Sequence, residues 1–323
     1  MIYIDTEPYR KKKNYFGNMT TVEELYFKRI FARYNDPSNL AELKSFIEQY
    51  IPDGINSSRD EETFFRHLIL LPPKELAKFA KIKYTEICND LKSSQSEVVD
   101  DLKKVYTDKI LSQSIVWRKS EININQFLVR ELGITVCPYC NRNYINNRGD
   151  RFAAQMDHFY SKDEFPWLAV SLYNLIPSCG ACNHIKGTKD FNVHPFIKSD
   201  VENNEVIFSY QQTASDDVKV IISTTDERKG DIGTIKLEEA YSIHNLDVRN
   251  MLLREEKYSK KYREELRQLL QTDGGIESQL SLTDDEIDRM IYGDVIFEED
   301  IKNVSLGKFR KDIYQEIKSF RDY

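Results

Sequence analysis

Residues 137–196 read CPYCNRNYINNRGDRFAAQMDHFYSKDEFPWLAVSLYNLIPSCGACNHIKGTKDFNVHPF. Four of the five cysteines of the chain lie here as two Cys-x-x-Cys pairs, Cys137 with Cys140 and Cys179 with Cys182. Asp157-His158 and Asn174 stand between the pairs, and Asn183 directly follows the second pair. Since this stretch gathers residue types used in metal binding and acid–base chemistry, we expect the rest of the chain to frame it.

The two cysteine pairs predict a structural zinc site. Each pair places two thiolates on one tight turn, and two such turns complete the four-sulfur tetrahedron that suits structural Zn²⁺. The alternatives are a thioredoxin-like redox motif, ordinary buried cysteines and an iron–sulfur cluster. No βαβ pattern surrounds either pair, which argues against the redox motif. Zinc is the interpretation that the spacing and the ligand type favour.

Length and composition indicate an ordered protein with a substantial core, because the chain has 323 residues of which 40% are hydrophobic. It contains no run of 18 apolar residues, and its N-terminus lacks the apolar core of a signal peptide. We therefore expect a cytoplasmic protein without a membrane segment. The net charge of −7 argues against a general nucleic-acid binder, but residues 137–198 carry seven basic and five acidic side chains. The acidic surplus thus belongs to the flanks.

The N-terminal third predicts a helical lobe. Thr21-x-x-Glu24 is a capping box for a helix to Tyr34, and Asp36-Pro37 opens a helix to Tyr50. Further helices are expected at 60–70, 73–92, 96–117 and 122–132, the last ended by Gly133. Residues 1–17 fit a solvated tail better than a phosphate-binding arm, and Cys88 fits a buried thiol.

The C-terminal third predicts strands and helices. Strands are expected at 205–210 and 218–224, followed by a loop at 225–230 and one long helix at 246–270. The basic and aromatic side chains of that helix suit either a phosphate backbone or a salt-bridged solvent face. Gly274-Gly275 predicts a break after this helix. Thr283 is expected to cap a short helix, and residues 306–320 are expected to form the closing helix.

Candidate catalytic residues lie between and after the cysteine pairs. A strand at 152–156 is expected to deliver Asp157-His158, with a second strand at 173–177 and a helix at 180–189. His158 has a side chain whose pKa suits a base near neutral pH. The oxygens of Asp157 and Asn183 suit Mg²⁺, although His184 is an alternative to Asn183. Lys186 is a candidate contact to phosphate.

A purely structural interpretation of these residues is the alternative to the catalytic one. A lone histidine is usually only a hydrogen-bonded side chain, and Asn174 can simply satisfy backbone groups at a strand edge. His194 is expected to pack beneath the helix. Phe165, Trp167 and Leu168 are expected to form the inner face of a short helix, although Trp167 could stack on a base.

Asp-His, then Asn-Leu, then Cys-x-x-Cys-Asn-x-x-Lys resembles the motif of the HNH endonucleases, which use a ββα-metal fold. The resemblance covers residues 137–196. It implies that His158 is the general base, that Asn174 holds the loop that positions this base, and that Asp157 and Asn183 bind the catalytic metal. The chain departs from the commonest pattern by having asparagine at the third position and SKDEFPWLAVSLY in place of a glycine-rich run.

The arrangement DHFYSK…YNLIPSCGACNHIKG is similar to the HNH component of Septu-like and retron-associated bacterial anti-phage defence systems. This narrower resemblance implies an ATPase as the partner protein, with the helical flanks as its docking surface.

We therefore expect an α+β, mostly helical protein with an N-terminal helical lobe at 1–133, a zinc-stapled ββα-metal module at 134–198 and a C-terminal lobe of strands and helices at 199–323. The expected function is Mg²⁺-dependent hydrolysis of nucleic acid, with DNA as the favoured substrate and RNA such as tRNA as the alternative. The competing hypothesis is a catalytically silent zinc module that binds nucleic acid or serves as scaffold for a defence ATPase.

Overall fold

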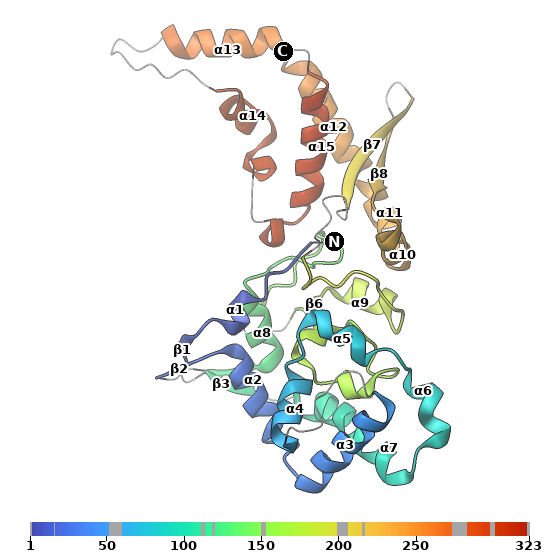
Figure 1. The fold of residues 1–323 in the computed structure, drawn as a ribbon. Helices are drawn as coiled ribbons and strands as arrows, with labels where there is room; N and C mark the ends of the chain where they lie inside the picture. The colour runs from blue at the N-terminus through green and yellow to red at the C-terminus, as the bar shows by residue number, and fades with distance from the viewer. Residues whose placement is uncertain are drawn as a thin grey trace. The chain divides into compact units, whose positions relative to one another are not determined.

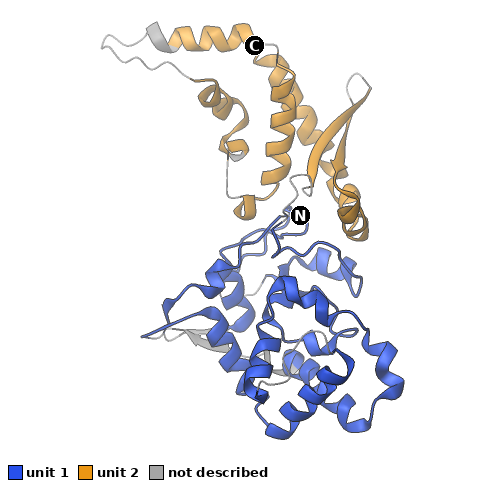
Figure 2. Cartoon of the chain, viewed as in Figure 1, with its two compact units in different colours: residues 1–200 blue, residues 201–323 orange. Residues whose placement is uncertain are grey.

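The computed structural model describes residues 2–15, 17–51, 60–110, 114–117, 120–149, 153–198, 206–214, 217–272, 283–297 and 301–321. The chain divides into two compact units, residues 1–200 and 201–323, which Figure 2 colours separately. Residues 1–133 and 134–198, expected as separate lobes, both fall within the first unit. The described part is mostly helical with small sheets, which confirms the α+β class.

Unit 1 is built mainly from helices (Figure 1). Its α-helices are α1 (Glu7–Arg10), α2 (Val22–Phe31), α3 (Pro37–Tyr50), α4 (Glu61–Ile69), α5 (Pro73–Phe79), α6 (Tyr84–Ile87), α7 (Ser93–Lys104), α8 (Ile124–Leu132) and α9 (Gly180–Lys186). The tighter or wider turns are the 3₁₀ segments η2 (Cys88–Asp90), η4 (Pro166–Leu168) and η5 (Leu172–Asn174) and the π-helix η3 (Val105–Ile110). The antiparallel strand pairs are β1 (Lys13–Tyr15) with β2 (Asn18–Thr20), β3 (Ser114–Trp117) with β4 (Ser120–Asn123), and β5 (Gln155–His158) with β6 (Leu175–Ser178).

Capping residues set the helix boundaries where the sequence predicts them. The Thr21 hydroxyl accepts from the Glu24 amide at 3.1 Å, and the Asp36 carboxylate accepts from the Ser38 amide at 2.9 Å. Gly133 ends α8 with a φ of +64°, a left-handed conformation that glycine adopts without strain. These caps satisfy amide and carbonyl groups that a helix leaves unpaired at its ends.

Two predicted helices are interrupted. The helix expected at 73–92 becomes α5, α6 and η2, because the Tyr84 amide donates instead to the Glu164 carbonyl at 2.7 Å. Cys88 is exposed in this turn, so its prediction as a buried thiol was wrong. The helix expected at 96–117 ends as η3 and β3, in which the β-branched Ile115 is opposite Ile122.

The N-terminal residues are ordered against the rest of unit 1 rather than forming a solvated tail. The Ile2 amide donates to the Pro138 carbonyl at 2.8 Å, and the Ile4 amide donates to the Pro195 carbonyl at 2.9 Å. Both isoleucine side chains are buried. The basic run that follows is partly neutralised, since Lys13 pairs with Glu131 at 2.8 Å. Burial of the alternating apolar side chains Ile2 and Ile4 explains why this segment is ordered although a solvated tail was expected.

Unit 2 is a strand pair accompanied by helices. Its elements are β7 (Ile207–Ala214), β8 (Asp217–Ser223), α10 (Asp226–Thr234), α11 (Leu237–Tyr241), η6 (Ser242–His244), α12 (Asn245–Lys257), α13 (Lys260–Thr272), α14 (Asp284–Tyr292), η7 (Asp294–Phe297), η8 (Ile301–Asn303) and α15 (Gly307–Ser319). The strand pair, the cap at Thr283 and the closing helix are confirmed. The loop expected at 225–230 is helical instead, because Asp226 and Glu227 suit the first turn of α10. The break expected at Gly274-Gly275 lies outside the described residues.

The long helix expected at 246–270 breaks at Tyr258 into α12 and α13. The break lets the Arg263 side chain turn inward, where it donates to the Tyr258 carbonyl at 2.8 Å and to the Asp288 carboxylate at 2.6 Å. Arg263 is 1% exposed. Arg263 was expected on the surface of this helix, facing either a phosphate backbone or a salt-bridged solvent side, but it belongs to a buried ion-pair cluster. No described helix combines the length and the apolar character that crossing a bilayer requires.

Candidate functional site

The four paired cysteines gather at one point of unit 1. Their sulfur atoms all lie within 4.8 Å of one another, and all four residues are buried. Zinc bonded to four sulfurs at about 2.3 Å separates neighbouring sulfurs by about 3.8 Å, and the Cys140 and Cys179 sulfurs lie 4.0 Å apart. The cluster predicted from the sequence is therefore confirmed as a group that could hold a metal ion such as zinc.

Hydrogen bonds shape the first turn of the cluster and reach its sulfurs. The Asn141 amide donates to the Cys137 carbonyl at 2.8 Å, and Asn141 itself adopts a φ of +50°, which asparagine tolerates better than most residues. The Arg142 amide donates to the Cys140 sulfur at 3.4 Å, and the Asn143 side chain donates to the Cys179 sulfur at 3.3 Å. Such donors offset the negative charge of four thiolates around one ion.

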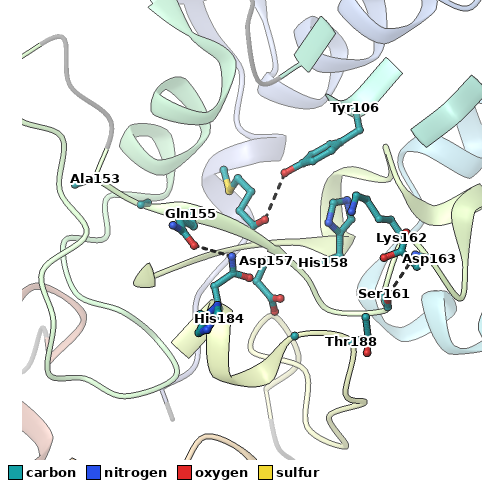
Figure 3. A pocket seen from close by; sticks show the side chains of 14 residues that line it. Tyr106, Ala153, Gln155, Asp157, His158, Ser161, Lys162, Asp163, His184 and Thr188 are labelled. Atoms are coloured by element: carbon teal, nitrogen blue, oxygen red, sulfur yellow. Dashed lines mark hydrogen bonds between the residues drawn. The ribbon is translucent and has the colours of Figure 1, made fainter. Parts of the chain in front are cut away.

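Strands β5 and β6 and helix α9 carry the predicted catalytic residues. In the antiparallel register, Asp157 is opposite Ile176 and His158 is opposite Leu175. Asp157 and His158 therefore lie within β5 rather than beyond its end. Cys179 caps α9, so Asn183 and Lys186 project from the helix that directly follows β6. Figure 3 shows Asp157, His158 and His184 around one cavity.

This cavity has a volume of about 720 Å³ and is open to solvent. Its lining residues come from η3, from β5 and α9, and from the segments that flank β5 and α9, namely Tyr106, Ala153, Ala154, Gln155, Met156, Asp157, His158, Ser161, Lys162, Asp163, Asn183, His184, Gly187 and Thr188. Three of the four predicted catalytic residues, His158, Asp157 and Asn183, thus share one cavity. Asn174 does not line it.

The His158 imidazole is held in one orientation. Its Nε2 lies 2.9 Å from the Ala169 carbonyl oxygen, and the Tyr106 ring packs edge-on against it at 4.4 Å between centroids. Because a carbonyl oxygen only accepts, Nε2 carries the proton and Nδ1 the lone pair. Burial lowers the pKa of His158 to about 4, although the bond to Ala169 opposes this shift, so the ring is neutral at pH 7.

Asn174 fixes the segment that carries the Ala169 carbonyl. Its side-chain oxygen accepts from the Tyr160 amide at 2.8 Å, and its side-chain nitrogen donates to the carbonyls of Tyr160 and Leu168, both at 3.0 Å. The side chain is fully buried, so these three bonds replace contacts with water. The role expected for Asn174, that of holding the loop beside the base, agrees with this geometry and stays a prediction.

The N-terminal helices hold the same segment from outside. The Trp167 ring nitrogen donates to the Phe79 carbonyl at 2.7 Å, and the Ser171 hydroxyl donates to the Leu68 carbonyl at 2.9 Å. The Tyr26 hydroxyl donates to the Val170 carbonyl at 2.9 Å. Trp167 is 0% exposed, so its ring is not available to stack on a base in this structure. The N-terminal helices therefore support the segment that carries the Ala169 carbonyl.

Asp157 is a buried carboxylate held at both oxygens. Oδ1 accepts from the Lys186 ammonium at 3.2 Å, and Oδ2 accepts from the Tyr139 hydroxyl at 2.6 Å. Burial raises the pKa of Asp157 to about 6, while the Lys186 charge and the Tyr139 hydrogen bond act in the opposite direction. The pair keeps a negative charge beside the cavity at the cost of removing two ions from water.

Lys186 points into the protein. Its side chain is 0% exposed, and its ammonium donates to the His158 carbonyl at 2.8 Å as well as to Asp157. It also lies over the Phe191 ring, 5.4 Å from the centroid. The phosphate contact expected for Lys186 stays a prediction. In the structure, its ammonium is bound by Asp157 and by the His158 carbonyl instead. Lys162 is a partly exposed cation in the cavity lining.

Asn183 is oriented by a residue that the sequence analysis did not single out. Its amide nitrogen donates to the Gln155 side-chain oxygen at 2.7 Å, which turns its own oxygen away from Gln155. His184 also lines the cavity. The choice between Asn183 and His184 as metal ligand therefore stays open. Gln155 precedes Asp157 by two residues, and the period of two along a strand is a signal that could have identified it.

Sequence reasoning also missed Tyr106 and Tyr139. Tyr106 belongs to the π-helix η3, a geometry frequent at functional sites, but nothing local predicts its contact with His158. Tyr139 stands between Cys137 and Cys140, so its place beside a metal site could be predicted from the sequence. Its hydrogen bond to Asp157 could not. His194, by contrast, is buried and packs against Phe159, while the place beneath the helix expected for it stays a prediction.

Comparison with curated proteins finds a distant homologue, the Septu protein PtuB of Bacillus thuringiensis, with 31% identity over 123 residues. The aligned region spans 36% of this chain and 45% of that protein, so the chain covers less than half of its relative. No protein-family model matches the chain. No solved structure matches it either.

Proposed function

We propose that this chain is a metal-dependent endonuclease of the HNH type, which hydrolyses phosphodiester bonds of nucleic acid. The observation that carries the proposal is the grouping of His158, Asp157 and Asn183 around one cavity by β5, β6 and α9. A two-stranded antiparallel sheet followed by a helix agrees with the ββα-metal fold that the motif resembles. The adjoining cysteine cluster would hold a structural metal for the module.

His158 acts as the general base in this proposal. The Ala169 carbonyl accepts a hydrogen bond from the protonated Nε2, so Nδ1 is the atom that accepts a proton from water. The lowered pKa keeps this lone pair available at neutral pH. Asn174 contributes indirectly, because it fixes the segment whose carbonyl selects the tautomer.

Asp157 and Asn183 would hold the catalytic cation. A carboxylate and an amide oxygen are hard ligands that suit Mg²⁺, and the bond from Asn183 to Gln155 leaves the amide oxygen as the group for a cation. When bound, the cation would neutralise charge on the scissile phosphate and on the departing oxygen. The donor set therefore fits the metal that the motif implies.

Lys186, whose ammonium lies beside Asp157, takes a different role in this proposal from the phosphate contact expected for it. We assign Lys186 to the stabilisation of the buried Asp157 carboxylate and Lys162, which lines the cavity, to contact with phosphate. Replacement of Lys162 by alanine should then weaken substrate binding and leave the stability of unit 1 unchanged.

The biological setting that we propose is Septu-type anti-phage defence. The similarity to the Septu protein PtuB supports it, and the resemblance of the DHFYSK…CNHIKG arrangement implies an ATPase as partner. DNA is the substrate that we favour, with RNA such as tRNA as the alternative.

The test is cleavage of plasmid DNA, single-stranded DNA and total tRNA by the purified full chain, with and without Mg²⁺. His158→Ala should abolish cleavage, whereas His67→Ala, at a histidine outside the cavity lining, should not. Zinc content is recorded for each protein. Absence of Mg²⁺-dependent cleavage by the zinc-loaded chain, alone and with the ATPase, would instead favour the silent nucleic-acid-binding module.

A further inference from the structure

The hydrogen bond from Tyr139 to Asp157 joins the cysteine cluster to the proposed catalytic carboxylate. Tyr139 lies between Cys137 and Cys140 in the first cysteine turn, and its hydroxyl is 2.6 Å from Asp157 Oδ2. We infer that Tyr139 is a positioning residue that orients Asp157 for the divalent cation and thereby couples the cation site to the cysteine cluster. The inference rests on the proposed function, which makes Asp157 a cation ligand.

The position of the hydroxyl is determined by its surroundings. The Tyr139 side chain is 0% exposed, and its ring packs edge-on against Phe191 at 5.2 Å between centroids. The backbone of the turn is held by two hydrogen bonds, from the Asn141 amide to Cys137 and from the Cys137 amide to Asn143. A phenol ring has few rotamers, so this packing restricts the position of the hydroxyl, which lies at Asp157 in the structure.

The second oxygen of Asp157 is held from the second cysteine pair. Lys186 follows Cys182 by four residues in α9, and its ammonium donates to Oδ1 at 3.2 Å. The Phe191 ring supports both donors, since it contacts the Tyr139 ring and lies beneath the Lys186 ammonium. Each oxygen of Asp157 therefore receives a donor that adjoins one of the two cysteine pairs.

This arrangement sets the plane of the carboxylate and keeps it able to bind a cation. A carboxylate oxygen has two lone pairs, so acceptance of one hydrogen bond leaves one for a metal ion. Without the Tyr139 hydroxyl, Oδ2 would lose its donor, and rotation about the terminal torsion, which is broad for aspartate, would be less restricted. Residues that hydrogen-bond to metal ligands commonly change metal affinity or activity by about 10- to 100-fold when they are replaced.

The test is Tyr139→Phe, which removes the hydroxyl and keeps the ring against Phe191. Binding of Mn²⁺ alone is measured by electron paramagnetic resonance, zinc content by mass spectrometry, and kcat and KM on the DNA substrate. We expect about tenfold weaker Mn²⁺ binding and about tenfold lower kcat, with KM and zinc content unchanged. Tyr34→Phe is the matched control, because that buried hydroxyl donates to the Val98 carbonyl, away from the cavity, and it should alter neither Mn²⁺ binding nor kcat.

Asp157→Ala separates failure of this inference from failure of the proposed function. If it abolishes Mn²⁺ binding while Tyr139→Phe binds Mn²⁺ like the unaltered chain, the positioning role is overturned and the proposed function stands. Loss of zinc from Tyr139→Phe would also overturn it, since the hydroxyl would then serve the cysteine turn. Unchanged Mn²⁺ binding and cleavage in Asp157→Ala would reject the ligand assignment itself.

Discussion

The Ala169 carbonyl accepts a hydrogen bond from Nε2 of His158 over 2.9 Å. This contact selects the tautomer of the proposed base, because only Nδ1 is left to accept a proton. Ala169 belongs to a segment that Asn174 and the N-terminal helices hold in place. The protonation state at the cavity thus depends on contacts made far from it in the sequence.

Asn174→Ala should lower both stability and activity. It removes three buried hydrogen bonds and leaves the Tyr160 and Leu168 groups unpaired, a loss of about 2–4 kcal/mol. Urea denaturation followed by fluorescence of the buried Trp167 measures it. Asn146→Ala, at an exposed asparagine, is the control and should change little. An Asn174→Ala protein with unaltered stability would contradict the assigned role.

Lys186→Met should destabilise unit 1 by about 3–5 kcal/mol, because it leaves the buried Asp157 carboxylate without its cation. The double variant Asp157→Asn with Lys186→Met should recover part of this loss, since neither charge is then buried alone. Denaturant titration of all three proteins measures the difference. A phosphate contact would give the opposite pattern, with unchanged stability and a raised KM.

Gln155→Ala should weaken Mn²⁺ binding several-fold, because the Asn183 amide loses the acceptor that orients it. Gln155→Glu keeps an acceptor oxygen at the same place and should retain binding. Calorimetric titration of both variants with Mn²⁺ makes the comparison. Equal affinity in Gln155→Ala and the unaltered chain would remove Gln155 from the site.

Cys182→Ser should lower the zinc content from one ion per chain to near zero and unfold part of unit 1, because structural zinc contributes about 10–16 kcal/mol of apparent binding free energy. Cys88→Ser is the matched control, since Cys88 is exposed and lies outside the cluster. Mass spectrometry and thermal denaturation measure both effects. Full zinc occupancy in Cys182→Ser would contradict a four-sulfur site.

Unit 2 should lose stability in acid through its buried ion-pair cluster. Burial alone raises the pKa of Asp288, but hydrogen bonds from Arg321, Tyr314 and Arg263 outweigh it and leave the pKa lowered. The pKa of Glu255 is lowered in the same way, chiefly by Arg321 and Tyr292. A carboxylate with a lowered folded-state pKa stabilises above its unfolded pKa of about 4, and the contribution is lost as the pH falls through the folded value.

Hydrogen exchange of α14, corrected for intrinsic rates, should therefore show less protection at pH 2.5, below the unfolded carboxylate pKa, than at pH 7. Asp288→Asn should reduce protection at pH 7 and flatten the pH dependence. Constant protection of α14 across this range would show that the cluster does not contribute as described.

Short-range chemistry explains what was predictable. The spacing within each cysteine pair predicted a metal-binding turn, and Thr21, Asp36 and Thr283 capped helices where expected, because each of these signals acts within a few residues. The two pairs themselves meet only through the tertiary fold, since the Cys140 and Cys179 sulfurs lie 4.0 Å apart. The errors at Cys88 and in the long helix at Tyr258 arose where local patterns competed with distant partners, whereas the helix at 225–230 follows from the acidic residues of its own first turn. Arg263, for example, leaves the predicted helix face for Asp288, 25 residues away.

The sequence by itself determined the mostly helical α+β class, the cysteine cluster and the set of candidate residues around Asp157-His158. Only the tertiary structure decided what those residues do. The tautomer of His158 depends on a carbonyl 11 residues later, and the burial of Lys186 depends on a carboxylate 29 residues earlier. Such contacts depend on the packing of whole elements, which no local pattern encodes, whereas caps and cysteine turns are complete within a single segment.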